Sequence, residues 1–249
     1  QEVVVLGEEK YRGYVGFKPP HLLSKEEGSR VLPLEEIFID VGLKPEIVKR
    51  NIHIGDYIAF ATRYGRMQDD LRTVKSLDNR ASVACGIMVL KSLAETAHGL
   101  NVHFIATSQE EYTGLGARIH AFKLPIDYAV VVDVAHAEHP DLKEYEYFPL
   151  NSGPCIVRGA TVPTKLYELL VDTAKALDIP YQIQPIPSRT GTDADDIAFN
   201  REGIPTCIVG IPLRYMHTPV EIVSLKDIGR AARLITSFIR RLGELPSNI

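Results

Sequence analysis

The alternation of amphipathic helices with short apolar strands over residues 69–249 constrains the fold more than any other feature of the sequence. Apolar side chains recur there at helical spacing, and short, almost entirely apolar runs separate the helical stretches. Such runs are typical of strands in a parallel sheet, because helices cover both faces of that sheet. We therefore predict an α/β fold with a mostly parallel, mixed sheet flanked by helices. The helices are expected at residues 79–97, 166–177 and 224–242, and the strands at residues 102–106, 127–133 and 204–210.

Residues 1–68 follow a different pattern, which is rich in strand candidates, broken by turns and without a long helix. We place a domain boundary near residue 68. This gives a smaller all-β domain at residues 1–68 and a larger α/β domain at residues 69–249. The strand candidates of the first domain are residues 3–6, 14–17, 36–41 and 56–61.

Composition limits the class of protein. The 249 residues are 45% hydrophobic and 24% charged, with a formal net charge of -4, so the chain has no basic field for nucleic acid. No stretch of about 18 apolar residues is present to span a bilayer, and we expect no membrane partner. The three cysteines lie far apart in apolar runs, where free thiols pack like small hydrophobes, which favours a reducing cytoplasm.

Acidic side chains follow two of the predicted strands. Glu110 and Glu111 come after one strand, and Asp133 ends the next. Ligands of open α/β sheets bind outside the carboxyl ends of the strands, so these acids are candidates for a site. Asp78 lies instead at the start of a helix, where a helix cap is the simpler explanation for a single carboxylate.

Each candidate also has an explanation without function. Glu110 and Glu111 can begin a solvated loop, and Asp133 can form a structural salt bridge. His217 alone is explained by core packing or by surface exposure. If the backbone is extended at the paired glutamates, their side chains point in opposite directions, so that one binds a metal while the other faces a water molecule.

Together these residues have the composition of a hydrolytic metal site. Carboxylate and imidazole ligands suit zinc or cobalt and also accept manganese, and a free carboxylate can take a proton from water. Two divalent ions would be nearly neutralised by three carboxylates and a bridging hydroxide. The sequence has no Gly-x-Ser-x-Gly elbow and no phosphate-binding loop to favour another chemistry. His136 and His139 fall in an acidic loop and are predicted to be surface residues.

Six motifs occur in one order over nearly the whole chain. Each is modest alone, and together they are specific. The motifs are GYVGFKPPHL at residues 13–22, LDNR at residues 77–80, the Glu110-Glu111 pair with Gly114, Asp133, GTDA at residues 191–194 and RYMHTP at residues 214–219. In this set the chain resembles the tetrahedral, self-compartmentalising glutamyl and deblocking aminopeptidases, a family of dinuclear metallopeptidases.

The resemblance implies a set of metal ligands. Asp78 would bridge two divalent metal ions, most simply zinc or cobalt. Glu111 and His217 would be further ligands of one ion, and Asp133 would be a ligand of the other.

The resemblance also implies a catalytic base and a substrate. Glu110 would take a proton from the attacking water and pass it to the leaving amine of a short peptide. Gly191, Thr192 and Asp193 would line the substrate end of the cleft, although a helix start with Asp193 near its N-terminus explains this segment equally well. In this family the β domain is inserted into the catalytic domain, and the protein self-associates as a dodecamer built from dimers.

One family ligand has no counterpart in this sequence. The family's first metal-binding histidine belongs to a His-x-Asp motif upstream of the Pro-Pro-His segment, and no such motif precedes Gly13. His21 and His53 do not replace it, because the first matches a position that is not a ligand and the second lies in the inserted domain. We expect the motif upstream of Gln1, so that the catalytic domain lacks its first segment here. Natural loss would instead predict a weak or single-metal site.

Several rival functions stay open. An N-acyl amino-acid deacylase or a carboxypeptidase of the same fold would use the same metal chemistry on a different substrate. A glycosidase, such as an endoglucanase, could use Glu110 and Asp133 as acid and base, although the chain has no tryptophan for sugar stacking. A non-catalytic assembly subunit is the remaining alternative.

Overall fold

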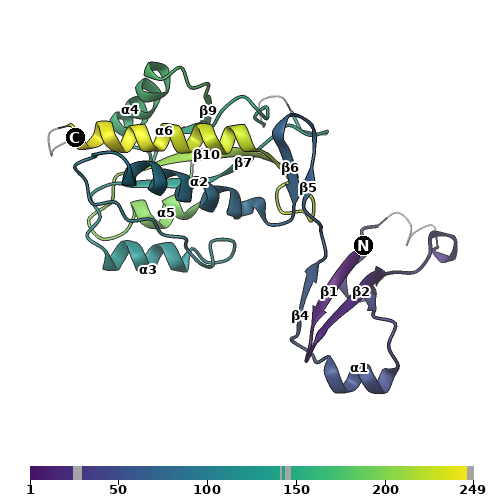
Figure 1. The fold of residues 1–249 in the computed structure, drawn as a ribbon. Helices are drawn as coiled ribbons and strands as arrows, with labels where there is room; N and C mark the ends of the chain where they lie inside the picture. Colours follow the sequence, from purple (N-terminus) through teal and green to yellow (C-terminus); the bar gives the residue numbers. More distant parts are fainter. Residues whose placement is uncertain (25–29, 141, 144–146, 246–249) are drawn as a thin grey trace. The chain divides into compact units, whose positions relative to one another are not determined.

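The chain divides into two compact units in its computed structural model, Gln1–Tyr64 and Gly65–Ile249 (Figure 1). The structure describes residues 1–24, 30–140, 142–143 and 147–245. The predicted boundary near residue 68 lies a few residues beyond this division.

The unit Gln1–Tyr64 contains one antiparallel sheet with the strand order β3-β2-β1-β4. Its strands overlap the four predicted ones, because the period-2 alternation of β1 puts Val3 and Val5 on a buried face. The sequence predicted an all-β unit, but the structure also has a short helix there. This helix is α1 (Pro45–Asn51), whose proline suits the first turn because the N–H that it lacks would have no partner there. The strands are β1 (Glu2–Leu6), β2 (Lys10–Gly16), β3 (Phe38–Asp40) and β4 (Tyr57–Phe60), and 3-10 turns occur at Pro20–Leu22 and Leu34–Glu36.

The unit Gly65–Ile249 is built on a mixed sheet with the strand order β5-β6-β11-β10-β8-β9, in which β7 pairs with β10. The central strand β10 is buried from Thr206 to Leu213. The predicted α/β class with a mixed, helix-flanked sheet is confirmed. Among the strand pairs that the structure describes, β7–β10 and β8–β9 are parallel and the others are antiparallel, so parallel pairing is less extensive than expected. The strands are β5 (Gly65–Arg66), β6 (Leu71–Val74), β7 (Ala129–His136), β8 (Cys155–Gly159), β9 (Gln182–Ile186), β10 (Thr206–Arg214) and β11 (Glu221–Ser224).

Helices cover this sheet. The helix α6 packs against both α2 and α4, and Figure 1 shows α4 and α6 on the opposite side of the strands from α3 and α5. Ser224 is the N-cap of α6 as predicted, and its hydroxyl accepts from the Asp227 N–H. In the part of the chain that the structure describes, no helix is both long and apolar enough to span a bilayer. The helices are α2 (Leu77–Ala94), α3 (Leu115–Lys123), α4 (Thr164–Ala176), α5 (Asp193–Ala198) and α6 (Leu225–Gly243), with a 3-10 turn at Gln68–Asp70.

All three strands predicted for this unit differ from the structure, and the one expected at residues 204–210 is β10, which begins at Thr206 and continues to Arg214. Residues 102–106 belong to no sheet in the described part of the chain, because an apolar run predicts burial but a strand also needs a hydrogen-bonded neighbour. The strand β7 continues to His136, so Asp133 lies inside the strand rather than at its end. The acid is thus held by a rigid element on both sides.

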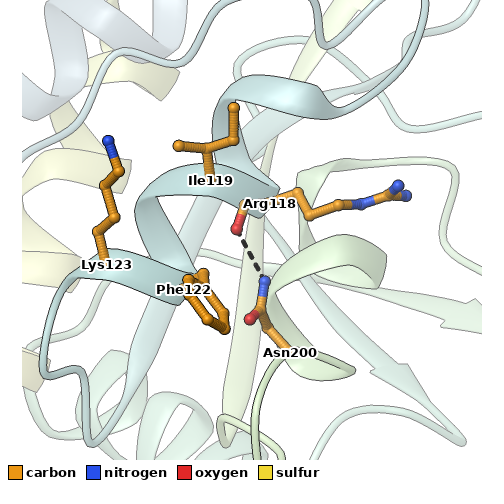
Figure 2. Close-up of a pocket in the computed structure, with 5 residues that line it drawn as sticks. All are labelled: Arg118, Ile119, Phe122, Lys123 and Asn200. Atoms are coloured by element: carbon orange, nitrogen blue, oxygen red, sulfur yellow. Dashed lines mark hydrogen bonds between the residues drawn. The ribbon is translucent and has the colours of Figure 1, made fainter.

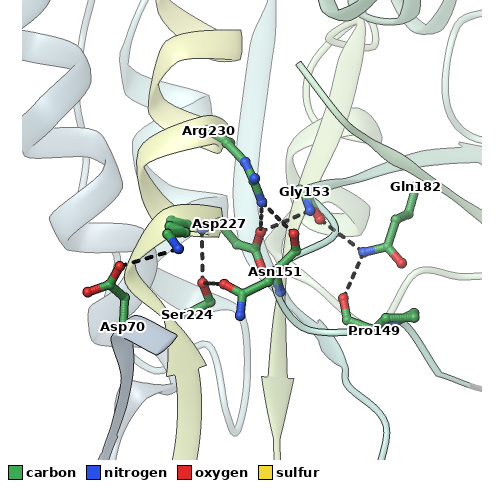
Figure 3. A network of polar contacts seen from close by, with 9 residues as sticks. Asp70, Pro149, Asn151, Gly153, Gln182, Ser224, Asp227 and Arg230 are labelled. Carbon is green, nitrogen blue, oxygen red and sulfur yellow. Dashed lines mark hydrogen bonds and ion pairs between the residues drawn. The ribbon is translucent and has the colours of Figure 1, made fainter. Parts of the chain in front are cut away.

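A buried carboxylate at the start of α6 joins this helix to the loop that precedes β8 (Figure 3). Asp227 is fully buried and accepts hydrogen bonds from the Asn151 N–H at 2.7 Å and the Gly153 N–H at 2.9 Å. The Arg230 guanidinium lies 3.1 Å from the same side chain. This network satisfies a buried charge and has a structural role.

Candidate metal centre

One cleft in the unit Gly65–Ile249 brings together most of the residues that the sequence singled out. Its walls come from the start of α2, the turn before α3, the strand β7, the loop before α5 and the turn between β10 and β11. Of the predicted site residues, Asp193 is the one that does not line this cleft. The lining includes Asp78, Glu110, Glu111, Asp133, Gly191, Thr192 and His217.

Three side chains in this cleft form a cluster with the geometry of a cation site. His217 Nε2 lies 3.0 Å from Asp78 Oδ2 and 3.3 Å from Glu111 Oε2. One ligand-type atom from each of the three residues lies within 4.8 Å of the others. Two carboxylates and an imidazole are a donor set that binds zinc and neighbouring transition metals, so the residues present fit the predicted ion.

Asp78 does not act as a simple helix cap. The N-cap of α2 is Ser76, and the backbone at Asp78 is not helical, with φ -76° and ψ 103°. The Asp78 side chain is 7% exposed and faces His217. The local turn therefore directs this carboxylate into the cleft, away from the helix N–H groups.

The two adjacent glutamates lie in a turn. Residues 110–113 form this turn, and the Gln109 carbonyl accepts hydrogen bonds from the N–H groups of Thr113 and Gly114, both at 2.9 Å. The extended backbone considered from the sequence is therefore wrong. Glu110 and Glu111 both line the cleft, but only Glu111 belongs to the cluster with His217. The turn therefore places the Glu111 carboxylate in the cluster and leaves the Glu110 carboxylate outside it.

Asp133 is held by hydrogen bonds rather than by a salt bridge. Its Oδ1 accepts from Asn79 Nδ2 at 2.8 Å and from the Val134 N–H at 2.7 Å. Because both hydrogen bonds use Oδ1, Oδ2 is the oxygen available to a cation. Asp133 lines the same cleft as Asp78 but lies outside the three-residue cluster described above.

The segment from Gly191 to Asp193 combines a cleft wall with a helix start. Thr192 is the N-cap of α5, and its hydroxyl accepts from the Ala194 N–H at 3.2 Å. Gly191 has φ +71°, a conformation that favours glycine. Asp193 is 8% exposed and accepts from Thr107 Oγ1 at 2.5 Å, while its Oδ1 is buried without a hydrogen-bond partner among the described residues. Asp193 therefore lies at the start of a helix, as one of the two explanations from the sequence proposed. Its Oδ1 is a buried acceptor near the site.

Without a bound cation, the acids of the cleft ionise less readily than free carboxyl groups. Burial raises the pKa of Asp78 to about 6, Glu111 adds to the rise, and His217 opposes it. Burial also raises the pKa of Glu110 and of Asp133 to about 7 each, and neighbouring carboxylates add to both rises. A bound cation would favour the charged forms, which is why an acidic, half-buried cluster of this kind suits metal ions.

Three residues of the centre were missed from the sequence. Asn79 positions Asp133, and the buried Glu221 accepts hydrogen bonds from the backbone at Asp78 and His217. His136 is exposed, as predicted, but it also lines the cleft, where desolvation and the nearby His217 and His139 lower its pKa. The available signal was proximity, because Asn79 follows Asp78 directly and Glu221 comes four residues after His217.

A second cavity lies between α3 and the segment after α5 (Figure 2). It is lined by Arg118, Ile119, Phe122, Lys123 and Asn200, and Asn200 Nδ2 donates to the Arg118 carbonyl at 2.8 Å. Its lining has no carboxylate or histidine. The metal-ligand chemistry therefore belongs to the first cleft.

The M42 glutamyl aminopeptidase family matches residues 1–234. The chain belongs to this family. It is 32% identical over 238 residues to a lysyl aminopeptidase of Pyrococcus furiosus, an alignment that covers 94% of this chain and 68% of that protein. The predicted resemblance is confirmed.

Solved M42-like structures share the fold. The TET aminopeptidase of Thaumarchaeota archaeon SCGC AB-539-E09 superposes with a TM-score of 0.89 at 30% identity, covering 97% of this chain and 70% of that one. The TET1 peptidase of Pyrococcus horikoshii, which can assemble into a tetrahedron or a large octahedral shell, gives a TM-score of 0.79 at 26% identity and covers 96% and 71%. The chain spans 64 to 68% of the length of three curated relatives. M42 membership supports a hydrolase of the aminopeptidase class, and the clustered ligand atoms agree with metallopeptidase chemistry.

Proposed function

We propose that this M42 protein is a metal-dependent aminopeptidase that removes N-terminal residues from short peptides. The observation that supports this most directly is the meeting of Asp78, Glu111 and His217 within 4.8 Å, with Glu110 beside them in the same cleft. These residues come from three distant parts of the sequence. Their convergence is difficult to explain by packing alone, because it places several acids together in a partly buried site.

The ligands of the proposed centre are Asp78, Glu111, His217 and Asp133. Asp78 would be shared between two divalent ions, zinc or cobalt in the first place and manganese as an alternative. A bound ion would polarise the scissile carbonyl and make a water molecule more acidic. The family resemblance implies one further ligand, and we propose that a histidine supplies it in a complete two-metal centre.

Glu110 is the proposed general base. It lines the cleft next to the ligand Glu111 without belonging to the ligand cluster, so its carboxylate stays free to move a proton. A carboxylate in this position can first accept a proton and then donate it, which is the role of a general base that later acts as an acid. It would accept the proton of the attacking water and return it to the leaving amine.

The wall formed by Gly191 and Thr192 is the proposed substrate contact. Asp195 accepts from the N–H groups of Thr190 and Gly191, both at 3.0 Å, and so fixes this loop beside the cleft. Asp193, which follows Thr192 directly, is the remaining residue of the proposed substrate segment, and its side chain accepts a hydrogen bond from Thr107 Oγ1. A loop fixed in this way can hold a peptide without ordering itself at the moment of binding.

We also propose that the protein self-associates, as a dodecamer built from dimers. The supporting observation is the likeness to TET proteins, one of which assembles into closed shells. A cytoplasmic setting is proposed because all three cysteines are free and buried.

The function is tested on full-length protein stripped with a chelator and then reconstituted with zinc, cobalt or manganese. We expect metal-dependent release of the first residue from peptides with a free α-amine, and no release from the same peptides after N-acetylation. Preference for the acetylated peptides would indicate a deacylase, and release from the carboxyl end a carboxypeptidase. Cleavage of β-glucans that survives chelation would indicate a glycosidase, and full metal binding without any cleavage an assembly subunit. Each of these outcomes would reject the aminopeptidase.

A further inference from the structure

A buried carboxylate lies directly behind the candidate metal centre. Glu221 begins β11 and is 2% exposed. Its Oε2 accepts hydrogen bonds from the N–H groups of Leu77 at 2.5 Å and Asp78 at 3.1 Å, and its Oε1 accepts from the His217 N–H at 3.0 Å. One side chain thus receives three backbone hydrogen bonds, and two of the donors are the backbones of proposed metal ligands.

This carboxylate joins two segments that are far apart in the sequence. Leu77 and Asp78 lie 144 and 143 residues before Glu221, while His217 lies only four residues before it. The pairing of β11 with β6, in which Glu221 lies opposite Val74, brings the start of α2 to this position. Glu221 therefore fixes the distance between the two backbones from which Asp78 and His217 project.

Both segments have backbone conformations that need support. Ser76, Tyr215 and His217 have φ values of 56°, 60° and 62°, in the left-handed region that side chains other than glycine adopt less readily. A turn of this kind keeps one conformation only when neighbouring contacts determine it. The hydrogen bonds of Glu221 are such contacts, because they join one buried side chain to backbone N–H groups of both segments.

We propose that Glu221 is a positioning residue of the metal centre, which holds the Asp78 and His217 backbones so that their side chains meet at one cation. It acts through these two residues and contacts neither the ion nor the substrate. This inference rests on the proposed function, because it assigns a role within the same metal centre. Hydrogen-bonding partners behind metal ligands commonly change metal affinity by 10- to 100-fold when they are replaced.

The variant Glu221→Gln tests this role with little change in shape. A carboxamide has a single acceptor oxygen, and its NH2 group would face a backbone N–H donor. One of the two segments therefore loses its acceptor. We expect the affinity for Co²⁺ to fall at least tenfold and the visible absorption of the bound Co²⁺ to change, because the ligand positions shift.

Asp227→Asn is the matched control. Asp227 is also buried in the same unit and accepts two backbone hydrogen bonds, from Asn151 and Gly153 (Figure 3). Neither of these donors is a proposed metal ligand or lines the cleft. We expect this variant to lower the Tm while it leaves the Co²⁺ affinity and absorption as in the wild type. An equal loss of affinity in both variants would reject a specific positioning role.

The experiment titrates chelator-stripped, full-length protein with Co²⁺ and follows visible absorption, with a competing chelator to fix the affinity. If the wild type binds no Co²⁺, the proposed function fails, and this inference fails with it. If the wild type binds Co²⁺ and Glu221→Gln binds equally well, only this inference is overturned. Should Glu221→Gln not fold, Glu221→Asp keeps the charge but is one methylene too short to reach both segments, and wild-type Co²⁺ affinity in that variant would overturn the proposal.

Discussion

The acids of the cleft make the stability of the metal-free protein depend on pH. Asp133 is the residue at which this dependence can be tested most directly. Burial raises its pKa to about 7 in the folded protein, whereas an unfolded chain gives aspartate a pKa of about 3.9. The folded state therefore binds more protons than the unfolded state between these two values. The contribution of Asp133 to stability therefore falls as the pH rises from about 4 to about 7, and it changes little above that range.

The expected magnitude follows from the two pKa values. A rise from about 3.9 to about 7 corresponds to about 4 kcal/mol for one fully coupled group. For a unit the size of Gly65–Ile249 this lowers the Tm by roughly 10 °C. The raised pKa of Asp78 and of Glu110 gives contributions of the same sign, so Asp133 accounts for part of the total fall.

Asp133→Asn isolates this contribution. The carboxamide oxygen can still accept from Asn79 Nδ2 and from the Val134 N–H, but the side chain cannot ionise. In the presence of a chelator we expect the fall in Tm between pH 5 and pH 8 to be clearly smaller than in the wild type. Saturating Zn²⁺ should abolish the fall in the wild type, because a cation stabilises the charged acids.

The assay is differential scanning calorimetry of full-length protein at fixed ionic strength. Glu168→Gln, on the exposed surface of α4, removes one carboxylate of the same charge and serves as the control. The reasoning is refuted if the Tm of the chelated wild type rises from pH 5 to pH 8. It is also refuted if Asp133→Asn shows the same fall as Glu168→Gln.

Three further predictions follow from single contacts. Glu110→Gln should lower kcat by about 10²- to 10⁴-fold while Co²⁺ affinity, measured by titration, stays unchanged, and wild-type kcat would exclude Glu110 as the base. Gly153→Ala should destabilise the protein by about 3 kcal/mol or more in urea unfolding, because φ is +93° and the added Cβ would lie 1.8 Å from the Pro180 carbonyl oxygen; wild-type stability would contradict this contact. Phe238→Ala should cost about 3 to 5 kcal/mol in the same assay, since Phe238 is fully buried, and a loss below about 1 kcal/mol would mean that the core around it collapses to fill the space.

Local patterns predicted much of the secondary structure. The helices around residues 79–97 and 166–177 and the helix after Ser224 follow from apolar side chains at helical spacing, and the structure has α2, α4 and α6 there. Strand pairing was predicted less well. Residues 102–106 have the composition of a buried strand, but a ladder depends on a neighbouring strand that no local pattern specifies.

The candidate site divides in the same way. The sequence by itself determined which side chains have metal-ligand chemistry, because residue type and short motifs such as LDNR and RYMHTP are local properties. The tertiary structure decided which of them meet: it joined Asp78 to His217 and directed Asp133 into the same cleft. It also decided the contacts of Glu221, whose Oε2 accepts from N–H groups 143 and 144 residues away. Hydrogen bonds over such separations depend on the pairing of β6 with β11 and leave no signature in the neighbouring sequence, so only the folded chain reveals them.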